Sequence, residues 1–236
     1  MIAPEARLPD NTPAPSGTAP HAPRTLRERL AWDPARGQVC DGPRRYLLMR
    51  PDVLMGAVAA MTPAYRESFL DGWAASTCAH GADSLRAYAA SVGGDPQALI
   101  DATTAAAADL GWGRWAMRLD ADSGTLHLAM TDSPFVAGWQ AATGGAQAPE
   151  AVCAPIRGMV QALAMALFDA PVQVTEVACA ASLVTPGASP EVTYGTLLDG
   201  APSASSDTTP GTGAPGHGTP GPAVALCEFI ARKVGP

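Results

Sequence analysis

The sequence predicts an α+β domain built around an antiparallel sheet, from three observations. Apolar residues recur at helical spacing over residues 51–111, which is typical of amphipathic helices. Apolar and polar residues then alternate over residues 114–131, as in a pair of strands. The remaining strand-like runs follow a further helix and do not alternate with helices one by one. Helices and strands grouped in this way are typical of the α+β class.

The composition supports a folded core and excludes several classes of function. Of 236 residues, 47% are hydrophobic and only 16% are charged, which is unlike a solvated tail or a coiled coil. The net charge of −7 argues against nucleic-acid binding, which relies on Lys and Arg to neutralise phosphates. No uncharged apolar run reaches the ~18 residues that suggest a membrane span.

The N-terminus and the cysteines predict a cytoplasmic location. Residues 1–24 lack the basic and apolar regions of a signal peptide. They are rich in Pro, Ala, Ser and Thr, and such a segment buries too little apolar surface to fold. We therefore expect a disordered leader at 1–24 and a domain over 25–236. Five cysteines without an export signal or regular spacing indicate reduced thiols.

The first elements of the domain are expected to be short. A helix is predicted from Thr25 to the region of Pro34, since proline disfavours helix in the residue before it. A brief strand is predicted over Tyr46–Met49. Pro51 then suits the first turn of a helix that extends to Met61.

Two longer helices follow. The first restarts at Thr62-Pro63, with a break expected near Gly81, and ends at Gly93-Gly94. Asp95 and Pro96 have the residue types of an N-cap and a first helical position, so a further helix is predicted up to Gly111. The residues expected to be buried on the first of these helices are Phe69, Trp73, Leu85 and Tyr88.

The second half of the chain is expected to supply the sheet. Residues 114–131 predict a hairpin whose turn, Asp120–Gly124, offers glycine for a positive φ. Residues 133–139 predict a loop or a short helix. Cys153–Phe168 predicts a buried helix and Pro171–Val177 a strand. The closing strand comes last, in the sequence ALCEFIARK.

A Gly/Pro/Ser/Thr-rich stretch separates the last two predicted strands. It extends over about residues 181–222 and has the composition of a segment that does not pack. We expect it to be an insertion at the surface of the domain.

The strand from Pro171 to Val177 places a carboxylate in the core. Alternation puts Glu176 on the face that carries Val172 and Val174, and a buried carboxylate requires a cation, a metal or a proton. Cys179 follows past a bend, and Cys227 lies on the inward face of the closing strand. If these strands pair, Glu176, Cys179 and Cys227 approach one another, and Cys153 at a helix start completes a set of four.

Three thiolates and one carboxylate are suitable ligands for zinc in a tetrahedral site. Such a filled site is structural, because no position remains for water, and we assign no catalytic residue. The alternative is that the cysteines serve as small buried hydrophobes and that Glu176 pairs with Arg157 or Arg232. No C-x-x-C motif is present, and the separation of Cys179 and Cys227 is not a recognised metal spacing.

Four aromatic residues are close together in the sequence and suggest a ligand pocket. Aromatic walls with a few polar groups are typical of small-molecule sites, although ordinary core packing is the alternative for each residue. No dinucleotide fingerprint, P-loop or nucleophile elbow is present. The candidate pocket residues are Trp112, Trp115, Phe135 and Trp139.

Several of these segments resemble the 4-vinyl reductase (4VR) domain family. The matching pieces are GWGRW, the SPF after the hairpin, VCAPIRGMVQALA, the E-x-x-C of Glu176 and Cys179, and the C-x-F of ALCEFIARK. That family belongs to a superfamily with haem-NO-binding domains and a vesicle-tethering component. The resemblance implies a single domain of helices packed on a twisted antiparallel sheet, dimeric, with an enclosed apolar cavity.

The resemblance also implies a zinc site beside that cavity. The metal-binding positions of its aromatic-sensing members match Cys153, Glu176, Cys179 and Cys227. The long interval before Cys227 departs from the family, in which the strands are joined by a short hairpin. A surface insertion accommodates this difference, because loop-closure cost grows slowly with length.

The leading functional expectation is the binding or sensing of a small hydrophobic or aromatic molecule, with zinc as a structural cofactor. Sensors of this kind carry an ATPase and a DNA-binding module that residues 1–236 lack, so a separate signalling protein is an expected partner. One alternative is an enzyme that takes part in 4-vinyl reduction in pigment synthesis. Another is a dimeric tethering or assembly protein. We expect the chain to be a homodimer and a binding protein rather than an enzyme.

Overall fold

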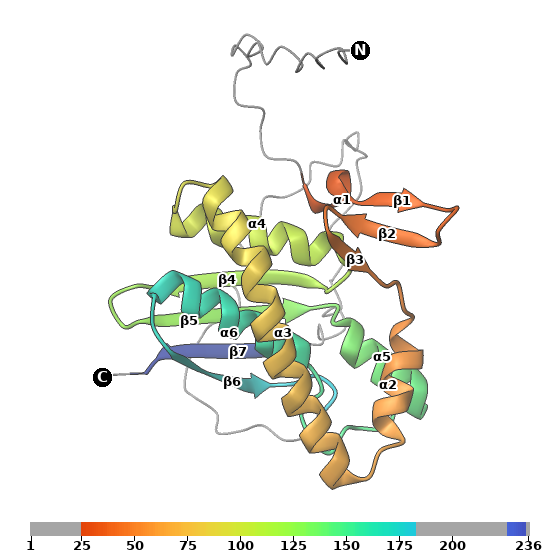
Figure 1. The fold of residues 1–236 in the computed structure, drawn as a ribbon. Helices are drawn as coiled ribbons and strands as arrows, with labels where there is room; N and C mark the ends of the chain where they lie inside the picture. Colours follow the sequence, from red (N-terminus) through yellow and green to blue (C-terminus); the bar gives the residue numbers. More distant parts are fainter. Residues whose placement is uncertain (1–24, 183–225, 235–236) are drawn as a thin grey trace, which may run out of the picture.

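The computed structural model describes residues 25–182 and 226–234, which form one α+β domain with helices packed against an antiparallel sheet (Figure 1). This confirms the predicted fold class. The leader expected at 1–24 lies outside the described residues. So does nearly all of the insertion expected at 181–222, of which only Ala181 and Ser182 are described.

The chain begins with a short helix and a small three-stranded sheet. Helix α1 (Leu26–Arg29) has a capping box, in which the Thr25 hydroxyl accepts from the backbone N–H of Glu28 and the Glu28 carboxylate accepts from that of Thr25. Antiparallel strands follow: β1 (Ala31–Asp33), β2 (Gln38–Asp41) and β3 (Arg44–Tyr46).

Two predictions for this region are wrong. The first helix ends at Arg29 and does not reach Pro34, because Leu30 is already extended. The strand predicted over Tyr46–Met49 lies earlier, at Arg44–Tyr46, and the residues after it are exposed. Gly37 and Gly42 adopt positive φ and reverse the chain between the short strands.

Three helices come next, each with proline in its first turn. They are α2 (Pro51–Ala59), α3 (Pro63–Ser91) and α4 (Pro96–Asp109). The Asp95 carboxylate accepts from the backbone N–H of Gln97, as predicted for an N-cap. The break expected near Gly81 is wrong, because α3 is continuous. An interior glycine costs a helix only about 1 kcal/mol, and Gly81 gives Met159 room to lie against α3.

The main sheet has the strand order β4-β5-β7-β6, with all neighbours antiparallel (Figure 1). The predicted hairpin is confirmed, since Asp120 pairs with Thr125 at its turn and Gly124 adopts a φ of 62°. The closing strand inserts between the hairpin and β6. The strands are β4 (Arg114–Asp120), β5 (Thr125–Thr131), β6 (Val172–Ala178) and β7 (Leu226–Lys233).

Two further helices pack against the helices α2 and α3. Helix α5 (Pro134–Thr143) packs against α2, and its N-cap is Ser133, whose hydroxyl accepts from the backbone N–H of Val136. Helix α6 (Ala154–Phe168) lies on β6 and β7, and α3 crosses over α6 (Figure 1). The core therefore lies between the sheet, α6 and α3.

The crossing of α3 and α6 is made by small residues. A Cβ atom added to Gly158 would collide with the backbone carbonyl of Ala74. This close approach buries Leu70 and Ala74 on α3. Leu85 is buried as predicted, but Phe69 is 39% exposed, so the prediction of its burial is wrong. Within residues 25–182 and 226–234, no helix is both long and apolar enough to cross a membrane.

Candidate functional site

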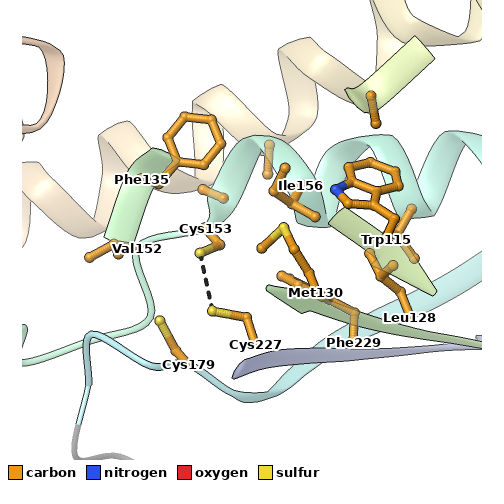
Figure 2. Packing of buried hydrophobic residues seen from close by; sticks show 14 of the residues in the cluster. Trp115, Leu128, Met130, Phe135, Val152, Cys153, Ile156, Cys179, Cys227 and Phe229 are labelled. Carbon is orange, nitrogen blue, oxygen red and sulfur yellow. Dashed lines mark hydrogen bonds between the residues drawn. The ribbon is translucent and has the colours of Figure 1, made fainter. Parts of the chain in front are cut away.

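Four side chains from distant parts of the chain converge at one end of α6. Their ligand atoms, three sulfurs and one carboxylate oxygen, all lie within 4.8 Å of one another, and all four residues are buried. We call them the Cys/Glu cluster. Figure 2 shows its sulfur atoms turned toward a common centre from α6, β7 and the segment after β6. The members are Cys153, Glu176, Cys179 and Cys227.

The first sulfur comes from the start of a helix and another from a central strand. Cys153 is the N-cap residue of α6, and its sulfur lies 3.3 Å from the Ser133 hydroxyl. Cys227 pairs across the sheet with Met130 of β5. The backbone N–H of Ala180 donates to the Cys227 sulfur at 3.4 Å.

A β-bulge brings Glu176 and Cys179 to the same face of β6. Glu176 pairs with Phe229 on the helix-covered face of the sheet, as its alternation predicts. Without a bulge, Cys179, three residues on, would point to the opposite face. The register shifts between Glu176 and Ala178, so Ala178 pairs with Glu228 on the other face. Cys179 is thereby returned to the face of Glu176.

The spacing of the sulfurs suits a metal better than a disulfide. The sulfurs of Cys153 and Cys227 are 3.7 Å apart, far beyond the roughly 2.05 Å of a disulfide bond. Both are free thiols. Sulfur ligands at about 2.3 Å from a tetrahedral zinc lie about 3.8 Å apart, which is close to the observed separation.

The Glu176 carboxylate is buried and forms no ion pair with Arg157 or Arg232, the partners that the alternative prediction gave it. Its Oε1 atom has no hydrogen-bond partner among the described residues, and the residue is 8% exposed. Arg157 pairs with Asp71 at 2.6 Å, and Arg232 is exposed. A buried polar atom left unsatisfied costs about 1–3 kcal/mol, so the site favours the arrival of a cation.

The protonation of the Cys/Glu cluster follows from its crowding and burial. Burial, and after it the electrostatic interaction with Cys179, raises the pKa of Glu176 well above its usual range. The pKa of Cys153 is also raised well above its usual value, because the thiol is hydrogen-bonded to Cys179 and Cys227 and is desolvated. Hydrogen bonds from Cys153 and Cys179 lower the pKa of Cys227 to about 4.

The pKa of Cys179 is affected in both directions. Its hydrogen bond with Cys153 lowers the pKa, but the hydrogen bond with Cys227 and burial outweigh this and leave the pKa raised. Near neutral pH the metal-free cluster therefore holds one thiolate, at Cys227, beside the thiols of Cys153 and Cys179, which retain their protons. A divalent cation would bind by displacing those protons.

Two of the four candidate pocket residues lie on one small cavity. Trp112 and Trp115 line a space of about 30 Å³ between α3, α4, β4 and α6, and the Trp115 indole donates to the carbonyl oxygen of Trp112 at 3.0 Å. The other lining residues are Ser84, Leu85, Tyr88, Thr103, Ala106, Ala107 and Met159.

The other two aromatic residues lie elsewhere. Phe135 makes edge-to-face contacts with Trp112 and Trp73, at centroid distances of 6.1 and 5.5 Å, without lining the cavity. The Trp139 indole donates to the carbonyl oxygen of Ala146 at 2.8 Å and its ring packs under Arg66. Nearness in sequence grouped the four residues, but the lining contributed by α4 and α6 was not singled out from the sequence.

Comparisons with known proteins identify the fold and leave the family open. No known family matches the sequence, and no curated protein matches it either. Among solved structures, the chain is similar to the phenol-responsive sensory domain of the transcription activator PoxR, determined with phenol. The TM-score is 0.60 at 12% sequence identity, over 88% of this chain and 86% of that chain. The resemblance to the 4-vinyl reductase family stays a prediction.

Proposed function

We propose that this chain senses or carries a small aromatic molecule, held in the cavity beside Trp112 and Trp115. The observation that carries the proposal is this Trp-lined cavity in a fold shared with a phenol-responsive sensory domain. Enclosed, mostly apolar cavities with a few polar groups are typical of small-molecule sites.

The lining of the cavity suits a ligand with an aromatic ring and a hydrogen-bonding group. Leu85, Trp112 and Trp115 offer apolar and aromatic surface. The Thr103 hydroxyl donates to the carbonyl oxygen of Leu99 at 2.7 Å, so its oxygen remains an acceptor for a ligand hydroxyl. Ser84 supplies a second hydroxyl.

An aromatic ligand must enlarge the cavity, because the volume of about 30 Å³ is only about that of one water molecule in the liquid. Met159 is the side chain best suited to move. It is half-buried on α6, it lines the cavity, and the unbranched thioether of methionine adapts easily to irregular spaces. We therefore expect the Met159 side chain to move out of the cavity when the aromatic ring of the ligand binds.

The proposal includes zinc at the Cys/Glu cluster. Cys153, Glu176, Cys179 and Cys227 provide a donor set of three sulfurs and one oxygen, and the unpartnered Glu176 oxygen supports a cation there. Four protein ligands fill a tetrahedral shell, so the metal would supply an electrostatic cross-link between α6, β6 and β7. It would take no part in catalysis.

A titration with single-ring aromatics tests the ligand proposal. We expect phenol, or another member of a series with benzene, toluene and cresols, to bind saturably at one site per chain. Ala106 lines the cavity, so Ala106→Leu should fill it and weaken binding at least about tenfold, as expected for the loss of 1.4 kcal/mol. Ala108→Leu is the matched control, because Ala108 is exposed on the same helix. Equal loss in both variants, or no binding in the series, would contradict the proposal.

A further inference from the structure

A second opening in the molecule reaches the Cys/Glu cluster from the solvent. It is a cleft of about 410 Å³ between α3, the segment before α6, α6 and β6. Four carboxylates line it, and we call it the acidic cleft. They are Glu67, Asp71, Glu150 and Glu176.

Glu176 links the acidic cleft to the cluster. Of the four cluster residues, it alone is among those that line the cleft. Its Oε1 atom is buried and has no hydrogen-bond partner among the described residues. None of the three cysteines lines the cleft, and Cys153 and Cys227 are 0% and 1% exposed, while Cys179 is 7% exposed. An ion that moves down the cleft would therefore meet the Glu176 carboxylate before it meets a thiol.

The mouth of the acidic cleft is negative. Glu67 is exposed there, and Asp71 and Glu150 form ion pairs with Arg157 and Arg66. The carboxylates of Glu67, Asp71 and Glu150 thus outnumber the two guanidiniums. A cleft lined by an excess of one charge raises the local concentration of the opposite ion and the rate at which that ion enters.

We infer that the acidic cleft is the entrance through which a divalent metal ion reaches the Cys/Glu cluster, with Glu176 as the first ligand that the ion meets. This inference rests on the proposed metal site. It assigns to Glu67, Asp71 and Glu150 a part in attracting the ion, although none of them belongs to the cluster.

Arg157 opposes the passage of the ion. Its guanidinium lines the acidic cleft and is held by Asp71 at 2.6 Å. The positive charge of Arg157 therefore lies in the lining of the same cleft as Glu176, where it repels a cation. Removal of this charge should speed entry, whereas addition of a positive charge at Glu67 should slow it.

The kinetics of Co²⁺ binding test the inference, because cobalt–thiolate absorption reports arrival at the sulfurs. Metal-free, reduced protein is mixed with Co²⁺ at low ionic strength, and release is followed separately with excess chelator. We expect Glu67→Lys to slow association threefold to tenfold and release by a similar factor, which leaves Kd within about threefold. Arg157→Gln should speed association about threefold. Asp122→Lys makes the same charge change on the exposed β4–β5 turn and should alter neither rate.

The possible failures are distinct. If the wild-type protein binds no Co²⁺ at its thiols, the proposed metal centre is wrong, and with it the entrance. If Co²⁺ binds and Glu67→Lys behaves as Asp122→Lys does, the metal centre stands and the entrance is overturned. If Glu67→Lys changes only the release rate of Co²⁺, with a matching change in Kd, the entrance is also overturned. A barrier at the mouth would change the association and release rates by the same factor. Circular dichroism establishes that each variant is folded.

Discussion

Glu176 ties the candidate metal centre to β6, because its buried Oε1 atom has no hydrogen-bond partner among the described residues. Alternation with Val172 and Val174 predicted that its carboxylate is buried, and the structure confirms this at 8% exposure. The position of Cys179 was less accessible to prediction. It depends on the bulge between Glu176 and Ala178, and no glycine or proline in VTEVAC marks that irregularity.

Metal binding at the Cys/Glu cluster should release protons. Cys153 and Cys179 have raised pKa values, as does Glu176, whereas the pKa of Cys227 is lowered to about 4. At about pH 6.5 the thiols of Cys153 and Cys179 still carry protons and Cys227 carries none, so zinc should displace at least two protons per ion. Calorimetry of zinc binding in buffers with different ionisation enthalpies measures this number.

The same measurement on two cysteine variants, one in the cluster and one outside it, tests which thiols bind the zinc. Cys179→Ser should lower the proton release by about one and weaken zinc binding at least about a hundredfold. Cys78→Ser should leave both unchanged, because Cys78 lies on α3 outside the cluster. A release of less than one proton in the wild-type protein would contradict the assignment of these four ligands.

The elements of the helical layer were predicted well wherever their first turns carry local signals. Pro51, Pro63 and Pro96 mark the starts of α2, α3 and α4, and Asp95 caps the last of these. The small sheet β1–β3 was missed because its strands have only three or four residues each. Such short runs contain too few alternations for a periodic pattern to be recognised.

The crossing of α3 and α6 explains why Phe69 was wrongly expected to be buried. Hydrophobicity favoured the large ring, but the buried positions are Leu70 and Ala74, since the two backbones meet at Gly158. A close approach of this kind depends on the partner helix. The sequence of α3 alone therefore does not predict which of its faces is buried.

Gly158→Ala should destabilise the protein through this crossing. The added methyl group collides with the carbonyl of Ala74, and overpacking of a core typically costs about 1–3 kcal/mol. The free energy of unfolding in urea measures the loss. Gly72→Ala is the control, because Gly72 is exposed on α3 with open space around it, and it should stabilise by up to about 1 kcal/mol. If both substitutions stabilise the protein, the backbones of α3 and α6 do not meet closely at Gly158.

At the scale of the whole molecule, the sequence predicted the elements better than their arrangement. The closing strand was recognised from ALCEFIARK, and it forms β7. Its insertion between β5 and β6 was not predicted beyond a possible pairing with β6, because the choice of neighbour strands is non-local. That placement brings Cys227 to the centre of the sheet, opposite Met130 and close to Cys153.

An apolar surface next to the small sheet is the candidate interface for the homodimer that the family resemblance implies. Leu47 and Leu48 are 78% and 70% exposed, and with Trp32 they line a depression of about 310 Å³. We expect sedimentation equilibrium to find a dimer that Leu48→Asp weakens at least about tenfold, through burial of an unpaired charge. Val234→Asp, at an exposed position after β7, should leave the dimer intact. A monomeric wild-type protein at micromolar concentration would contradict the expected homodimer.

We expect the aromatic ligand to bind between Trp112, Trp115 and Met159. The most direct test of this binding is the NMR spectrum of protein with ¹³C-labelled methionine methyl groups, recorded as the tightest-binding aromatic of the titration series is added. The Met159 methyl resonance should shift saturably, by the ring current of the ligand and by displacement of the side chain. Met165, 42% exposed on the same helix, should not shift. Saturable binding with an unchanged Met159 resonance, or no binding by any member of the series, would contradict the account.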